Sequence, residues 1–135
     1  MPQEEMTVDE YRKLTFEITL LDMPPSLNNA YATVTNRGVS RRVMSTAARS
    51  WKDTATILIR NAGRLNGFDI APKQPFVIDA LYTAPNVLVW DLDGKAKLLI
   101  DAFCDAFGVD DRYLMELRQR KARGACSVHM KVTVL

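Results

Sequence analysis

The stretch VLVWDLDGKAKLLIDAFCDAFG, residues 87–108, carries the clearest structural pattern in the chain. From Leu92 onward, apolar residues recur at spacings of three and four, which is typical of a helix with one buried face, and Gly108 marks its end. The preceding residues 87–90 are all apolar and predict an extended segment. The sequence therefore predicts an extended segment that leads through Asp91 directly into an amphipathic helix.

The regions around this helix predict a β-sheet and a second helix. A helix is expected to begin at Ser45, a good N-cap residue, and to end at Asn66–Gly67, while Asn36 to Gly38 favours a flexible turn or hairpin. Strands are expected at residues 15–21, 75–82, 113–121 and 128–134. The predicted fold is α+β: a single domain, residues 15–135, with a small mixed sheet backed by two main helices in the order β-α-β-α-β-β. Residues 1–14 are expected to be a loose acidic N-terminal extension.

Two stripes run along the predicted helix at 45–65. The apolar stripe, which we expect to face the core, consists of Ala47, Trp51, Ala55, Leu58, Ala62 and Leu65. The basic stripe consists of Arg49, Lys52, Arg60 and Arg64. Either a solvated face or a phosphate-facing surface accounts for the basic stripe.

Composition limits the class of protein. Of 135 residues, 47% are hydrophobic and 25% charged, with a net charge of +2, which excludes a disordered, collagen-like or disulfide-stapled chain. No apolar run approaches the roughly 20 residues needed to span a membrane, and the start of the chain does not have the pattern of a signal peptide. We therefore expect a soluble cytoplasmic protein with no membrane partner, in which Cys104 is a buried thiol rather than half of a disulfide.

The charges are segregated along the chain. Residues 31–64 hold seven basic residues and one acidic, and residues 112–135 hold six basic and one acidic. Between them, all six acidic residues of 91–111 are aspartates. Aspartates often cap helices and fill turns, but a cluster of them between basic segments also suits a metal site that faces a polyanion.

Asp91 and Asp93 are the first candidates for metal ligands. In an extended chain, residues two apart project to the same side, and a helix has only one N-cap, so capping explains one of the two carboxylates at most. A third carboxylate from Asp111, with Asp110 as a substitute or helper, would complete an oxygen-rich site for Mg²⁺. Such a site suits hydrolysis of a phosphodiester.

Lys97 has two interpretations. It lies one helical turn after Asp93, where it could pair with that carboxylate or reach a phosphate oxygen. Alternatively, it forms a structural ion pair that Asp101 continues. The single histidine, His129, lies in a regular strand pattern, so the sequence offers no nucleophilic triad.

The chain resembles the RusA-type Holliday junction endonucleases over residues 15–135. The matching features are PPSLNNAY at 24–31, STAARSW at 45–51, DLDGKAKLLIDAF at 91–103, and Val109-Asp110-Asp111 followed by a strand and a closing hairpin. The resemblance implies a homodimer that resolves four-way DNA junctions by paired nicks, dependent on Mg²⁺ with Mn²⁺ as an alternative. It assigns the catalytic roles to Asp91, Asp93, Lys97 and Asp111, and the metal to the three aspartates among them.

The DNA-contact candidates come from the same resemblance and from the basic segments. They are Asn28, Asn29, Arg41, Arg42, Arg118, Arg120 and Lys121. The chain departs from the family at two points: Gly94 stands where the family usually has Asn, and residues 87–90 are apolar where the family usually has polar or basic residues. The apolar segment could be buried or packed against a partner chain.

Two other functions also fit parts of this sequence. VLVWDLDG also resembles the opening motif of haloacid dehalogenase-type phosphatases, but Lys95 stands where that motif has Thr or Ser, and too little chain follows for the parallel βα units of that fold. A non-catalytic DNA-binding module, with the acidic cluster as a salt-bridged helix end, is the second alternative. An EF-hand is excluded because Gly94 occupies the fourth position of the loop and not the sixth.

Overall fold

The computed structural model describes residues 14–25 and 31–135, without the side chains of Tyr31, Ala32 and Asp93. The predicted extension at 1–14 therefore lies outside the described residues, except for Leu14. The helices are α2 (Thr46–Leu65), α3 (Asp93–Phe107) and the short 3₁₀ helix η2 (Asp111–Tyr113). The strands are β1 (Thr15–Leu20), β2 (Tyr31–Asn36), β3 (Val39–Met44), β4 (Phe76–Ala84), β5 (Leu114–Arg123) and β6 (Ser127–Val134). None of the described helices combines the length and hydropathy needed to cross a membrane.

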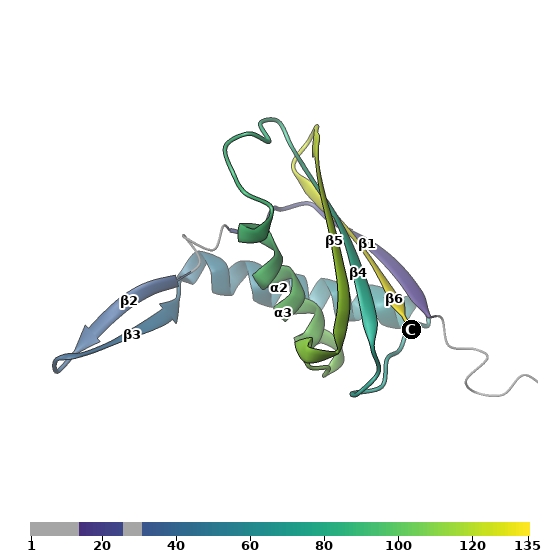
Figure 1. The fold of residues 1–135 in the computed structure, drawn as a ribbon, viewed down its shortest axis with the longest axis horizontal. Helices are drawn as coiled ribbons and strands as arrows, with labels where there is room; N and C mark the ends of the chain where they lie inside the picture. Colours follow the sequence, from purple (N-terminus) through teal and green to yellow (C-terminus); the bar gives the residue numbers. More distant parts are fainter. Residues whose placement is uncertain (1–13, 26–30) are drawn as a thin grey trace, which may run out of the picture.

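Four strands form one mixed sheet in the order β1-β6-β4-β5, and α2 and α3 cover one of its faces (Figure 1). β4 and β5 are parallel, whereas β6 is antiparallel to both β1 and β4. Parallel neighbours need a crossover connection, and α3 provides it by running back from the end of β4 toward the start of β5. The predicted α+β class with a mixed sheet and two main helices is confirmed.

The core lies between the sheet and the two helices. Alternate residues of β4 and β6 point inward, among them Ile78, Tyr82 and Met130, and all three are almost completely buried. Several phenylalanines pack together near the start of β4, and Phe103 of α3 lies at their centre with its ring 5.1 Å from that of Phe76. α3 is therefore held firmly along its length, which fixes the positions of both its ends.

The predicted order omits two strands. β2 and β3 form a separate two-stranded hairpin that projects from the start of α2, away from the main sheet (Figure 1). Its turn is Arg37–Gly38, both with positive φ, in the region where a turn was expected. All residues from 33 to 42 are exposed, so the hairpin has no core of its own, and hydrophobic patterning could not identify its strands.

The buried face of α2 differs from the predicted stripe. Ala48, Ala55, Ile59 and Gly63 are buried, whereas Ala47, Leu58 and Leu65 of the predicted stripe are exposed. Apolar residues occupy more than one face of this helix, so the pattern alone did not decide which one packs. Packing against α3 determines which face is buried. Phe107 of α3 lies so close to Gly63 that a larger side chain at position 63 would clash with its ring.

Candidate functional site

Asp91 lies where the β4–α3 loop meets the start of α3. The predicted extended segment at 87–90 is wrong: these residues form an irregular, bent loop, and Leu92 already has the helical φ and ψ of −60° and −46°. Asp91 and Asp93 are therefore not two residues of an extended strand. Leu92 is partly buried and packs against the core.

No carboxylate is needed as the cap of α3. Leu92 is the N-cap residue and makes no side-chain capping bond, so Asp91 does not serve as an N-cap. Asp91 is exposed, and no hydrogen bond or ion pair joins its carboxylate to another of the described residues. An exposed carboxylate without a partner among the described residues is available to bind a cation.

The loop before Asp91 is held by Lys121 of β5. Its ammonium group donates to the carbonyl oxygens of Val87 at 2.7 Å and Trp90 at 2.6 Å, and it lies 4.7 Å from the centre of the Trp90 ring. These two short bonds from one charged donor fix the backbone on both sides of Leu88 and Val89, which form the tip of the loop. Lys121 therefore positions the peptide that carries Asp91.

Lys95 holds the same loop from the other side. It is 9% exposed, donates to the carbonyl oxygen of Pro24 at 2.9 Å, and lies 5.3 Å from the centre of the Trp90 ring. Burial lowers the pKa of the Lys95 ammonium. Trp90 is thus contacted by two lysines and, edge to face, by Tyr82, and its indole N–H donates to the carbonyl of Asn86 at 3.1 Å.

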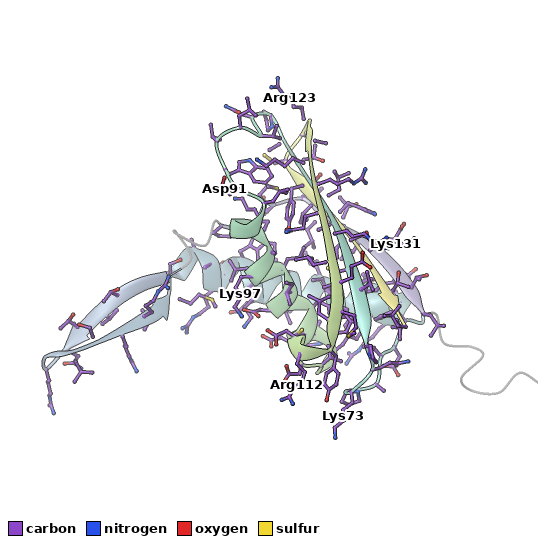
Figure 2. The ribbon with its side chains drawn as sticks, in the orientation of Figure 1. Lys73, Asp91, Lys97, Arg112, Arg123 and Lys131 are labelled. Carbon is purple, nitrogen blue, oxygen red and sulfur yellow. The ribbon has the colours of Figure 1, made fainter. Side chains whose placement is uncertain are left out.

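Asp110 and Asp111 lie at the opposite end of α3. Figure 2 labels Asp91 near one end of this helix and Arg112, the residue after Asp111, at the other. Because α3 has 15 residues, a rise of 1.5 Å per residue separates the two ends by roughly 20 Å. One cation cannot bridge this distance, so a single chain does not bring Asp91 and Asp111 to the same metal.

The described residues contain no group of three or more His, Cys, Asp or Glu side chains that could hold a metal ion. The side chain of Asp93 is not among the described ones. Asp93 is nevertheless the first residue of α3 and follows Asp91 by two positions. A pair of carboxylates is a sufficient protein contribution to a Mg²⁺ site when water and phosphate supply the other oxygens.

Asp101 and Asp105, two further aspartates of the cluster, are paired with lysines. Lys97 contacts Asp101 at 2.9 Å, so the structural ion pair considered from the sequence is present. Lys52 of α2 contacts Asp105 at 2.7 Å, and Arg60 donates to the carbonyl of Ala106 at 3.3 Å. These two members of the basic stripe therefore join α2 to α3 rather than forming a solvated or phosphate-facing surface.

Asp110 is engaged with its own turn. It caps η2 by accepting from the backbone N–H of Arg112, and it also pairs with the Arg112 guanidinium at 3.2 Å. These contacts, the backbone bond first, lower the pKa of Asp110. Asp111 is the exposed carboxylate beside it.

The basic residues predicted to contact DNA are spread over three surfaces. Arg41 and Arg42 lie on the projecting hairpin. Arg118 and Arg120 lie on the open face of the sheet, where Arg118 pairs with Glu116 at 2.8 Å, whereas Lys121 reaches the helix side and the loop before Asp91. Asn28 and Asn29 lie outside the described residues.

The remaining nucleophiles are not arranged for catalysis. Cys104 is buried, as predicted, and burial raises the pKa of its thiol to about 12, while Cys126 is exposed and both cysteines are free. The Nδ1 atom of His129 lies 3.0 Å from the hydroxyl of Thr19 on the open face of the sheet. The Nε2 atom of the same ring lies 3.9 Å from a carboxylate oxygen of Glu17, on the same face of the sheet and away from the Asp91 loop.

No family model matches this chain, and a search of curated proteins found no match. The site must therefore be interpreted from its own geometry. Sequence reasoning missed Trp90 and Lys95 as parts of it. The one available signal was the presence of a tryptophan and a lysine immediately around DLDG, and both were considered only as departures from known motifs.

Proposed function

We propose that this protein is a Mg²⁺-dependent endonuclease that acts on branched DNA, with four-way junctions as its substrate, and that it works as a homodimer. The observation that carries the proposal is Asp91: an exposed carboxylate with no capping role and no described partner, at the end of a loop fixed by two lysines. The segregated charges and the resemblance to the RusA-type endonucleases support the same function.

The residues of the chain divide the work. Asp91 and Asp93 would hold Mg²⁺, with Mn²⁺ as an alternative, and their carboxylate oxygens are the ligands these ions prefer. When bound, the cation activates water for attack and neutralises negative charge on the phosphate. The backbone N–H groups at the start of α3 would face the phosphate, and Lys121, Lys95 and Trp90 would keep Asp91 in position.

Asp111 enters this scheme through a second chain. Since roughly 20 Å separates the two ends of α3, we place Asp111 of the partner subunit next to Asp91 and Asp93. A two-fold axis then repeats the arrangement, so that two α3 helices lie antiparallel and each end of the pair forms one site. Two equivalent sites match the two related strands that must be cut in a four-way junction.

DNA contact is assigned mainly to the hairpin β2–β3. Its charged residues are Arg37, Arg41 and Arg42, without an acidic residue among residues 31–44. A basic two-stranded ribbon is suited to phosphates and to the width of the major groove. Arg118 and Arg120 lie on the opposite side of the sheet from the Asp91 loop, so their contact with the same DNA segment requires the DNA to bend around the sheet.

The deciding experiment is cleavage of a labelled four-way junction in Mg²⁺, with linear duplex as competitor. We expect Asp91→Asn to reduce cleavage at least 1000-fold (roughly 4 kcal/mol) while junction binding is kept or strengthened, because repulsion of phosphate falls. Asp53→Asn, which changes an exposed carboxylate on α2, is the matched control and should cleave like the wild type. Full cleavage by Asp91→Asn would contradict the role assigned to Asp91, and junction binding without any cleavage by the wild type would favour the non-catalytic DNA-binding module.

The phosphatase alternative is not proposed further. Its motif requires a strand that ends at the nucleophile within a parallel sheet, whereas residues 87–90 form a bent loop and only β4 and β5 of the main sheet are parallel.

A further inference from the structure

Two large apolar side chains stand in solvent directly before the candidate metal ligand. Leu88 is 79% exposed and Val89 is 73% exposed, three and two residues before Asp91, respectively. The sequence left open whether this segment is buried or packed against a partner chain, and among the described residues neither Leu88 nor Val89 is buried. Isolated exposed apolar residues are common on protein surfaces, so the setting of these two decides their meaning.

The backbone that carries them is fixed. The N–H of Leu88 donates to the side-chain oxygen of Asn86 at 3.1 Å, which closes an Asx turn at the start of the tip. Lys121 binds the carbonyls of Val87 and Trp90, and the Trp90 indole returns to Asn86. Every residue that flanks the tip therefore makes a specific hydrogen bond, so the two side chains are presented on a rigid support.

Two basic residues of β5, Lys121 and Arg123, lie at the end of the molecule that carries this loop. Arg123, the last residue of β5, is paired in register with Ala84, where the loop leaves β4, and it is exposed. Figure 2 shows Arg123 and Asp91 at the same end of the molecule. A small apolar tip bordered by positive charge is complementary to DNA, whose phosphates surround apolar base faces.

The size of the tip also favours a base over a protein partner. A stable protein interface buries about 800 Å² on each side and involves about 20–30 residues, far more than two adjacent side chains. A wedge between base pairs, by contrast, commonly consists of one or two apolar residues such as Leu, Ile or Met.

We propose that Leu88 and Val89 form a wedge that contacts the unstacked bases at the branch point of the DNA, next to the phosphate to be cut. This inference rests on the proposed function, because it takes branched DNA as the ligand. Opening the stack at the branch point brings the strand that crosses there within reach of Asp91. The wedge thereby gives the loop a role in selecting branched over linear DNA.

The experiment uses four-way junctions with 2-aminopurine at the branch point, whose fluorescence increases when the base is unstacked. Full-length Asp91→Asn protein, which leaves the DNA uncut, is compared with the same protein carrying Leu88→Ser and Val89→Ser. We expect the first to raise the fluorescence, and the second to lose most of this rise and to bind junctions roughly tenfold more weakly, with binding of linear duplex unchanged. Leu65→Ser, at an 87% exposed leucine near the end of α2, is the matched control and should keep the full signal.

The outcomes separate this inference from the proposed function. If the fluorescence rises equally with and without the Leu88→Ser and Val89→Ser changes, the wedge is overturned, even if the wild type cuts junctions. Absence of junction binding by the wild type also overturns it. A rise that depends on Leu88 and Val89 without any Mg²⁺-dependent cutting supports the wedge and overturns the nuclease. Sedimentation adds one test: a shift from dimer to monomer caused only by the double change would make the tip a contact between two copies and would overturn the wedge.

Discussion

The two ends of α3 use the same type of residue in opposite ways. At the C-terminal end, Asp101, Asp105 and Asp110 are each paired with a lysine or arginine. At the N-terminal end, lysines are also present, but they bind backbone carbonyls and leave the carboxylate of Asp91 exposed. The C-terminal end of a helix repels anions and the N-terminal end attracts them, so pairing is needed at one end only.

This difference indicates which part of the acidic cluster is structural. The paired aspartates join α2 to α3 or stabilise a turn, and their charges are already balanced. At the other end, Lys95 and Lys121 donate to backbone carbonyls and so stabilise the conformation of the loop. The comparison makes the contrast testable, because changes at the two ends should affect different properties of the protein.

The largest expected effect tests whether each site is formed by two chains, with Asp91 from one subunit and Asp111 from the other. Asp91→Asn and Asp111→Asn should each abolish cleavage when present in both subunits. Co-expression of the two variants should restore it, because half of the dimers are then mixed and one of their two sites has all its carboxylates, which gives roughly a quarter of the wild-type sites. Single-stranded nicks should be measured on a labelled junction. If each site belonged to one chain, the mixture would stay inactive.

The next effect tests the role of Lys121. Lys121→Met should lower kcat roughly 10- to 100-fold, since loss of two charge-assisted bonds lets the Asp91 loop move. The KM for DNA should change little, the Trp90 emission should shift to the red, and Lys121→Arg should recover part of the rate. Lys131→Met, an exposed lysine of β6, is the control. A higher KM with unchanged kcat would assign Lys121 to DNA contact instead.

A smaller effect is expected in the packing of the other end. Gly63→Ala would normally stabilise a helix, but here the added methyl group meets the Phe107 ring, so we expect a loss of about 1–3 kcal/mol in the free energy of unfolding. Urea titration measures it. Asn61→Ala, at an exposed position of the same helix, should be neutral or slightly stabilising. A stabilised Gly63→Ala protein would contradict the close packing of α2 on Phe107.

The smallest effect is that of the Lys52–Asp105 pair. The hydrogen bond to Asp105 raises the pKa of Lys52, so the folded state binds this proton more tightly than the unfolded state does. The contribution to stability is present at neutral pH and is lost as the pH rises above 10.5. Because the pair is partly exposed, Lys52→Met should cost at most about 1 kcal/mol at pH 7. Urea midpoints at pH 7 and 11 should differ less for this variant than for the wild type.

The sequence predicted the elements of the main body because their patterns are local. Ser45 caps α2 with a bond to the N–H of Ala48, Gly108 ends α3 in the left-handed conformation, and the inward residues of β6 alternate as expected. The hairpin strands and the buried face of α2 depend on which neighbours they meet, and this information is absent from a local pattern.

The candidate site was predicted only in part for a related reason. Residue type and spacing drew attention to Asp91 and Asp93, but spacing in the sequence does not give distance in space. Asp91 and Asp111 lie at opposite ends of α3, which runs back from the end of β4 to the start of β5 (Figure 1). The role of Lys121 could not be predicted, because its partners are backbone carbonyls, which every residue carries.

The β4–α3–β5 crossover has one further consequence for the proposed dimer. If each site joins the start of one α3 to the end of its partner's, the helix works as a ruler, and its 15 residues set the interval between the two cuts. Adding one turn would move the cuts apart by about 5.4 Å without altering either site. The length of a single secondary-structure element would then specify the geometry of the DNA that the dimer can process.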